Sequence, residues 1–234
     1  MGDPSLLTNA FGCTLGPMQI AIGLYPEFTA LDAIGPYQVL SLLPGAEVVI
    51  CAAQKGLLPD DNGLLNFDIV HTFDDVPRPD VLLVPGGIIT RRLARDGDPI
   101  VDWIRSAHDH TTYTTSVCTG SLLLGAAGVL EGKLATTHWL SYDVLESYGA
   151  TATEQRVVRE GKIFTAAGVS AGIDLALTLV AELADDATAQ ALQLAIEYDP
   201  QPPFDSGAPS KAPAEIVELV TAIVREGERV SLEA

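Results

Sequence analysis

The chain has 234 residues, of which 47% are apolar and 19% are charged, and its mean hydropathy is +0.26. This composition excludes an intrinsically disordered chain, and the lack of an apolar run of about 18 residues disfavours a membrane-spanning protein. The 13 Lys and Arg against 31 Asp and Glu give a net charge of −18, which disfavours nucleic-acid binding because phosphate binding needs clustered cations.

The expected elements alternate between apolar strands and helices, with Gly- and Pro-containing turns between them. In chain order they are a loose extension at 1–17, a strand at 18–25, a helix at 31–43 with Pro36 near its first turn, a strand at 46–53, a small hairpin and loop within 56–75, a strand at 81–84, a helix at 99–110, a strand at 111–117, helices at 121–127 and 141–148, a hairpin at 156–166 turned by Glu160-Gly161, helices at 171–183 and 188–196, a Pro-rich loop at 199–213 and a helix at 214–229. The last helix carries an apolar face that we expect to pack on the body, formed by Ile216, Val217, Val220, Ile223 and Val224.

Continuous apolar strands that alternate with helices are typical of an α/β protein whose mostly parallel sheet is covered by helices on both faces. The segment beyond the Pro-rich loop is too short to form a core of its own. We therefore expect a single α/β domain over residues 18–234, preceded by the extension at 1–17.

Cysteine usage indicates the compartment. The three cysteines, Cys13, Cys51 and Cys118, are far apart and form no CxxC pair, which suits a reducing environment better than a disulfide framework. The amino-terminal residues have no basic segment followed by an apolar core, so they do not resemble a signal peptide. A cytoplasmic protein is expected.

A thiol stands where a strand meets a helix made of small residues. Cys118 lies in Thr115-Ser116-Val117-Cys118-Thr119-Gly120-Ser121, the layout of a nucleophile elbow with Cys in place of Ser. A helix amino terminus at this position is expected to lower the pKa of the thiol. The alternative is a buried structural cysteine.

Two further segments follow strands that should end at the same edge of the sheet. Gly86 and Gly87 could turn their N–H groups toward an oxyanion, with the N–H of Thr119 as the other half of the hole, or could form an ordinary turn. Asp32 lies among apolar residues, where a carboxyl group serves either as a proton donor and acceptor beside the thiol or as a helix cap.

Other residues are candidates for the walls of the same pocket. His138 follows the strand after the elbow helix and either lines the pocket or is a structural histidine. Ile34, Gly35 and Trp139 are further candidates for its walls. No spacing of Cys, His and carboxylates predicts a metal site.

Three segments together resemble the ThiJ/PfpI superfamily of class I glutamine-amidotransferase-like folds: VLLVPGG, SVCTGSLLLGAAGVLEGKLATTHW and AGVSAGID. The resemblance covers residues 18–200. Within the superfamily, the LDAIGP segment at 31–36 and the EYDPQPPF segment at 197–204 are most similar to the isonitrile hydratase branch. Segments like SVCTGS and TTHW also occur in AraC-type regulators, which carry an additional DNA-binding module.

The resemblance implies a flavodoxin-like fold, a homodimer, a small-molecule substrate and no cofactor. It implies that Cys118 is the nucleophile, Thr119 its neighbour at the oxyanion site and Asp32 the catalytic acid. Many members have Glu at the acid position, so Asp32 disfavours protease, glyoxalase and deglycase activities. The implied reaction adds water to an isonitrile through a Cys118 thioimidate and releases an N-substituted formamide.

Two other functions remain open from the sequence. An exposed thiol of low pKa beside a carboxyl group could act as a redox sensor, or the site could belong to another hydrolase of the superfamily. The chain could also be a binding module in which the thiol only packs.

Overall fold

The computed structural model describes residues 16–233, and the extension expected at 1–17 therefore lies almost wholly outside the described residues. A seven-stranded sheet runs through the centre in the order β10-β11-β7-β6-β1-β2-β5, with β10 antiparallel and all other neighbours parallel. Its strands are β1 (Met18–Gly23), β2 (Ala46–Ala52), β5 (His71–Thr72), β6 (Val81–Val84), β7 (Tyr113–Val117), β10 (Val157–Glu160) and β11 (Ile163–Ala166).

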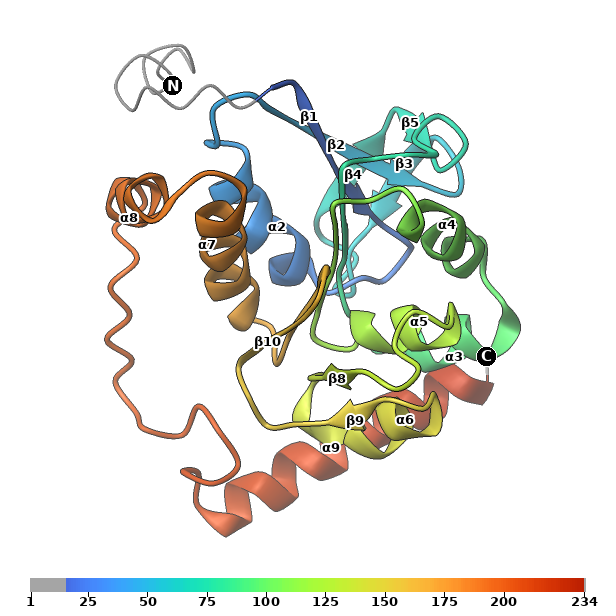
Figure 1. The fold of residues 1–234 in the computed structure, drawn as a ribbon. Helices are drawn as coiled ribbons and strands as arrows, with labels where there is room; N and C mark the ends of the chain where they lie inside the picture. The colour runs from blue at the N-terminus through green and yellow to red at the C-terminus, as the bar shows by residue number, and fades with distance from the viewer. Residues whose placement is uncertain (1–15, 234) are drawn as a thin grey trace.

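Helices cover both faces of this sheet (Figure 1). On one face lie α2 (Ala30–Leu40), α7 (Ala171–Leu183) and α8 (Asp186–Ala195), of which α7 packs on both α2 and α8. On the other lie α3 (Thr90–Asp96), α4 (Pro99–His108) and α5 (Gly120–Ala126). This is the flavodoxin-like α/β arrangement expected from the sequence.

Strand β6 in the middle of the sheet is buried on both faces, which explains why its sequence Val-Leu-Leu-Val is continuously apolar rather than alternating. Every residue of β6 and β11 is buried. Burial of large side chains such as Phe164 and Leu83, both 0% exposed, contributes about 2 kcal/mol each to folding. The core is therefore centred on the strands that lead into the site described below.

Several small elements complete the chain. The expected hairpin within 56–75 is formed by β3 (Gly56–Pro59) and β4 (Asn66–Ile69). The strand expected before His138 is β8 (Leu134–Ala135), which pairs in parallel with β9 (Thr151–Ala152). The sequence did not predict α3, β9 or the short 3-10 helix η1 (Trp139–Ser141) before α6 (Tyr142–Ser147).

Two local predictions were wrong. Pro36 is in the interior of α2 rather than near its first turn, and its ring packs against α7 at Gly172. The carbonyl of Asp32 thereby loses the helical N–H donor that proline lacks. The β10–β11 hairpin turns through Gly161-Lys162, one residue later than expected, because Glu160 pairs with Ile163.

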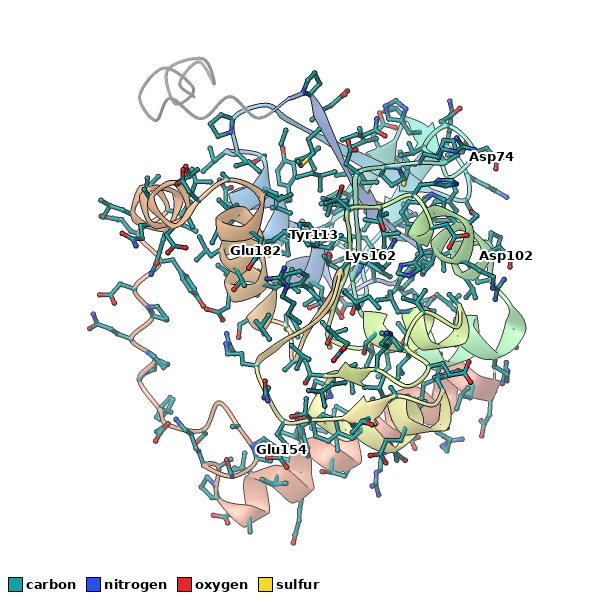
Figure 2. The ribbon with its side chains drawn as sticks, viewed as in Figure 1. Asp74, Asp102, Tyr113, Glu154, Lys162 and Glu182 are labelled. Carbon is teal, nitrogen blue, oxygen red and sulfur yellow. The ribbon has the colours of Figure 1, made fainter. Side chains whose placement is uncertain are left out.

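The C-terminal part of the chain is attached differently from the rest. Residues 198–213, which we call the C-terminal arm, contain no helix or strand and lead to α9 (Ala214–Glu233) at the lower end of the molecule in Figure 1. An ion pair from Arg91 of α3 to Glu228 (2.9 Å) helps to hold this helix. Figure 2 shows the arm passing along one side of the body.

The apolar face of α9 corrects a further prediction. Val217 and Val224 are half-buried against the body, but Ile216, Val220 and Ile223 are exposed. The exposed fraction of Ile223 reaches 63%. Part of the apolar face of α9 is exposed to solvent, because the side that faces the body also includes Thr221, Glu228 and Ser231. Within residues 16–233, no helix is both long and apolar enough to cross a membrane.

Candidate active site

The site lies where the order of the sheet reverses. In the sheet, β2 lies on one side of β1, whereas β6 lies on its other side and is followed outward by β7. The loops that follow β1 and β6 therefore leave the sheet in different directions. Ligands of doubly wound folds bind in this crevice, at the carboxyl ends of the strands. Asp32, Gly86 and Cys118 follow β1, β6 and β7 respectively, and all three meet there.

Cys118 occupies a strained turn, as the elbow pattern predicted. Its φ angle is 55°, in the left-handed region that non-glycine residues rarely adopt. Its N–H donates to the carbonyl groups of Ala166 (3.0 Å) and Ala167 (2.8 Å). Its own carbonyl accepts hydrogen bonds from the hydroxyl groups of Thr137 and Ser121, both at 3.2 Å. Hydrogen bonds on both sides of the residue therefore hold the strained backbone in place.

The tight turn also explains the glycine two residues later. A Cβ at Gly120 would overlap the carbonyl oxygens of Val84 and Pro85, the latter at 2.7 Å. The first turn of α5 can approach the end of β6 this closely only without a side chain.

The expectation of a low thiol pKa was wrong. Burial, and then the negative charge of Asp32, raise the pKa of Cys118 well above its usual value, while the N–H and hydroxyl groups of Thr119 and the N–H group of Val169 act in the opposite direction. The side chain is only 6% exposed. Because the redox-sensor alternative assumed an exposed thiol of low pKa, the structure removes its premise.

The carboxyl group of Asp32 is buried, and the group that donates a hydrogen bond to it lies outside α2, the helix that contains Asp32. Its Oδ2 accepts a hydrogen bond from the N–H of Gly86 (2.8 Å), and its Oδ1 has no hydrogen-bond partner among the described residues. Burial raises the pKa of Asp32 to about 7, against the lowering effects of the Gly86 N–H and of the Cys118 thiol. Since its carboxylate does not bond to the amino terminus of α2, the helix-cap alternative is not supported.

Gly86 and Gly87 position two side chains. The N–H of Gly87 donates to the hydroxyl oxygen of Thr119 (3.0 Å), just as that of Gly86 donates to Asp32. Both N–H groups therefore have partners within the protein, and oxyanion binding by Gly86 and Gly87 stays a prediction. A Cβ at Gly86 would lie 2.6 Å from the N of Thr119 and 2.8 Å from Oδ2 of Asp32, so glycine is needed for this close approach.

Tyr25 completes the interior of the site, although nothing in its own sequence segment had singled it out. Its hydroxyl donates to the carbonyl of Pro85 at 2.7 Å. Its pKa is raised well above the usual value by burial and by the charges of Asp32 and Cys118, which places it near both. Only its position just after β1 could have indicated this.

A cavity of about 430 Å³ is connected to Cys118 through Ala167 and Val169, which line it and whose backbone groups contact Cys118, although Cys118 itself does not line it. It is lined by Leu31, His138, Trp139, Tyr142, Glu154, Arg156, residues 167–170 and residues 207–209. The predicted wall residues His138 and Trp139 are therefore present, but Ile34 is not among the lining residues. Gly35 does not line the cavity either: a Cβ at this position would lie 3.1 Å from the side chain of Ile173, so its role is to let α2 and α7 pack closely.

The ring of His138 is neutral around pH 7, because burial, and then the charge of Arg91, lower its pKa. Its Nδ1 accepts a hydrogen bond from the N–H of Leu140 (3.4 Å), which leaves the proton on Nε2. The ring of His138 thus lines the cavity, with its Nδ1 bonded to the backbone of Leu140.

No metal-binding cluster is found among the described residues. Across residues 16–233, no three His, Cys, Asp or Glu side chains are grouped closely enough to hold a metal ion.

Known proteins share both the sequence and the fold of this chain. The family model described as "DJ-1/PfpI family" matches residues 18–182. Isonitrile hydratase of Pseudomonas putida is 48% identical over 202 residues, which are 86% of this chain and 87% of that protein. The HTH-type transcriptional regulator CdhR of Pseudomonas aeruginosa is 30% identical over 65% of this chain, but that match spans only 43% of the regulator.

Solved structures agree on the fold. A ThiJ/PfpI family protein from Pseudomonas syringae superposes with a TM-score of 0.88 at 37% identity, covering 100% of this chain and 96% of its own. DJ-1 of Toxoplasma gondii gives a TM-score of 0.68 at 20% identity, covering 78% of this chain and 100% of its own, and supports the fold alone.

Proposed function

This chain belongs to the DJ-1/PfpI family, and we propose that it is an isonitrile hydratase with Cys118 as nucleophile and Asp32 as acid and base. The reaction adds water to R–N≡C and gives the formamide R–NH–CHO. The observation that carries this function is the 48% identity to an isonitrile hydratase over 86% of the chain. The paired thiol and carboxyl group support the assignment of roles.

Near neutral pH, the group of this pair that gains or loses a proton is Asp32. The pKa of Asp32 is about 7, whereas that of Cys118 is raised well above its usual value, so the resting pair is a thiol beside a carboxyl group that is partly ionised. Transfer of the thiol proton to the carboxylate creates a thiolate and a carboxylic acid at the same time. An isonitrile carbon needs both, because it must accept a nucleophile and a proton.

In the first step, the sulfur of Cys118 forms a bond to the terminal carbon, and the proton held by Asp32 is delivered to that carbon. The product is the thioimidate R–N=CH–S–Cys118, and Asp32 is left as a carboxylate. The N–H groups of Thr119 and Val169, which interact with the sulfur, stabilise the thiolate before it attacks.

In the second step, the oxygen of a water molecule adds to the thioimidate carbon while the Asp32 carboxylate takes one of the water protons. Asp32 passes that proton to the imine nitrogen and is again a carboxylate. The adduct R–NH–CH(OH)–S–Cys118 then breaks its C–S bond. The hydroxyl proton returns to the sulfur by way of Asp32, which releases the formamide and restores the thiol. No oxidant or reductant is consumed.

The hydroxyl group of Thr119 forms two hydrogen bonds with the backbone of Gly87. It donates to the carbonyl of Gly87 and accepts from the N–H of the same residue, both at 3.0 Å. We assign Thr119 a positioning role through its side chain and a thiolate-binding role through its N–H group.

Infrared loss of the isonitrile stretch, with an aryl isonitrile and the purified protein, tests the function directly. Formamide should accumulate with the wild type and fall to the uncatalysed rate with Cys118→Ala and with Asp32→Asn. Both variants should keep the circular dichroism spectrum of the wild type. Wild-type turnover by either variant would overturn the assignment of roles, and an inert wild type would overturn the function.

We also propose that residues 18–234 act as one catalytic unit, that the chain works in the cytoplasm, and that it forms a homodimer. The sparse cysteines support a reducing compartment, and the family resemblance supports the dimer. Sedimentation equilibrium would show a mass of about twice 24.6 kDa for the dimer, and a single-chain mass would contradict it.

A further inference from the structure

The hydroxyl group of Tyr25 and the carboxyl group of Asp32 bind opposite ends of one peptide unit. The hydroxyl donates to the carbonyl of Pro85 at 2.7 Å, and the N–H of the same peptide unit, that of Gly86, donates to Oδ2 of Asp32 at 2.8 Å. We propose that Tyr25 is a positioning residue: through this peptide unit it orients and strengthens the hydrogen bond to Asp32, and so controls how tightly Asp32 holds its proton. The inference rests on the proposed role of Asp32 as acid and base.

The peptide unit between Pro85 and Gly86 can transmit this effect because it is planar. A donor that fixes the direction of its carbonyl also fixes the direction of its N–H. Among the described residues, the hydroxyl of Tyr25 is the only hydrogen-bond donor to the carbonyl of Pro85. The next carbonyl, that of Gly86, accepts from the N–H of Thr29 at 2.8 Å. Tyr25 and Thr29 therefore hold two successive peptide units beside Asp32.

Close packing keeps the hydroxyl of Tyr25 directed at this carbonyl. The ring is only 2% exposed, and a Cβ at Gly87 would lie 3.4 Å from its Cε2, so the ring lies against the same loop. A Cβ at Gly120 would lie 2.7 Å from the carbonyl oxygen of Pro85, yet α5 donates no hydrogen bond to that oxygen within the described residues. Without the hydroxyl of Tyr25, the carbonyl would lose its donor and the peptide unit its orientation.

The hydrogen bond from Tyr25 also changes the strength of the one to Asp32. A donor at the carbonyl oxygen of a peptide unit polarises the unit and makes its N–H a better donor. A better donor stabilises the carboxylate over the carboxylic acid. Burial raises the pKa of Asp32 to about 7, and the N–H of Gly86 acts against this rise. Tyr25 thus favours the carboxylate that the proposed reaction needs to take the thiol proton.

Charge on Tyr25 does not produce this effect. The tyrosine is neutral, because burial, and then the charges of Asp32, Cys118, Asp61 and Asp98, raise its pKa well above the ordinary value. The other ionisable groups that act on Asp32 are Cys118 and Asp61, and they stay in place when Tyr25 is changed. Removal of the hydroxyl therefore removes no charge, and a change in the pKa of Asp32 would report the hydrogen bond.

Tyr25→Phe tests the inference, because it keeps the ring and removes only the hydroxyl group. Difference infrared spectroscopy would follow the C=O stretch of the protonated Asp32 carboxyl group, identified by its absence in Asp32→Asn. The midpoint of its titration should rise by about half a pH unit over that of the wild type. The matched control is Tyr113→Phe, at the end of β7 remote from Cys118, where the ring packs on Phe164. This tyrosine is labelled in Figure 2, and its variant should leave the midpoint unchanged.

A stronger donor at the same position should have the opposite effect. Difluorotyrosine in place of Tyr25, with both fluorine atoms next to the hydroxyl group, keeps the ring and the hydrogen bond but makes the hydroxyl a better donor. The midpoint for Asp32 should then fall below that of the wild type. The inference requires shifts of opposite sign from the two variants. An unmoved midpoint in either, or shifts of the same sign, would overturn it.

Hydration of an aryl isonitrile distinguishes positioning from general damage to the fold. Because the reactive pair contains an ionised Asp32, kcat/KM of Tyr25→Phe should fall about threefold near pH 6, which corresponds to a shift of about half a pH unit. Near pH 9, where Asp32 is ionised in both proteins, kcat/KM should stay within about 1.5-fold of the wild type. A fall by the same factor at both pH values would indicate structural damage and contradict the inference.

The infrared titration needs no hydratase activity, so the two possible failures can be told apart. If the wild type hydrates no isonitrile but the midpoints move as expected, the proposed function falls and the coupling of Tyr25 to Asp32 stands. If hydration proceeds and the midpoints do not move, the function stands and the role of Tyr25 falls.

Discussion

The elbow around Cys118 and the C-terminal arm differ in how they are held. The elbow lies between buried strands, with a glycine at each close approach and hydrogen bonds on both sides of its strained residue. The arm has no helix or strand, and its residues are mostly exposed. Bond-making atoms must be fixed to within a fraction of an ångström, whereas a segment that lines a cavity, as residues 207–209 do, tolerates larger displacements. The difference indicates that substitutions should damage the two regions to very different degrees.

The largest effect is expected at the elbow for Gly120→Ala. The new methyl group would overlap the carbonyls of Val84 and Pro85, which belong to the backbone and cannot rotate away. We expect a loss of about 3 kcal/mol in the free energy of unfolding, measured by urea denaturation. Gly207→Ala in the arm, where nothing lies within 4 Å of the new methyl group, is the matched control and should change stability by less than about 0.5 kcal/mol. Similar losses for both would remove the contrast between the regions.

Asp32→Asn should abolish activity and yet increase the stability of the folded protein. The pKa of Asp32 is 3.8 in an ordinary environment and about 7 here, so the folded state keeps the proton in a range of pH where the unfolded state has lost it. The wild type therefore loses stability as pH rises from about 4 to about 7, by about 4 kcal/mol at most, and the amide variant does not.

The variant should thus gain in melting temperature over the wild type between pH 4 and pH 8, although it has no turnover. Scanning calorimetry of both proteins across that range checks the sign. A difference in melting temperature that is independent of pH would contradict a raised pKa.

Thr137→Val tests the hydrogen bond from Thr137 to Cys118, and we expect its effect to be intermediate in size. The hydroxyl of Thr137 binds the carbonyl of Cys118 at 3.2 Å, and its loss should cost about 1 kcal/mol of stability. Because the strained turn would relax, kcat should fall about tenfold at unchanged KM, and Thr137→Ser should restore it. A parallel change of KM, or no rescue by serine, would indicate that Thr137 only fills space.

The smallest effect is expected at the C-terminal end for Ile223→Ser. Its side chain is 63% exposed on α9, so the free energy of unfolding of a lone chain should change by less than about 0.5 kcal/mol. Thermal unfolding at several protein concentrations is the measurement. A large, concentration-dependent loss would show that the outer face of α9 is covered in solution.

The sequence predicted the elbow well and the periphery poorly, for physical reasons. Asp32 follows the largely apolar run of β1, and Cys118 follows β7, whose residues Tyr113–Val117 have high strand propensity; the sheet then brings the two loops together. The pKa of Cys118 was misjudged because a helix amino terminus is visible in a sequence, whereas burial and a neighbouring carboxylate 86 positions away are not.

Residues that act through their backbone groups could not be predicted from the sequence either. The N–H of Val169 reaches the thiol, and no side chain marks it. Thr137 stood within the segment that drew attention to His138, yet its partner is the carbonyl of Cys118. On α9, periodicity correctly indicated an amphipathic helix but could not say how far its apolar face turns toward the body.

The exposed arm also bears on how such a protein changes over generations. Positions with open space around them accept most substitutions without loss of folding, and Gly207 is of this kind. Because residues 207–209 also line the cavity, drift in this short segment can reshape the cavity wall while the elbow stays as it is. A lineage built on this scaffold can therefore change its cavity faster than its nucleophile.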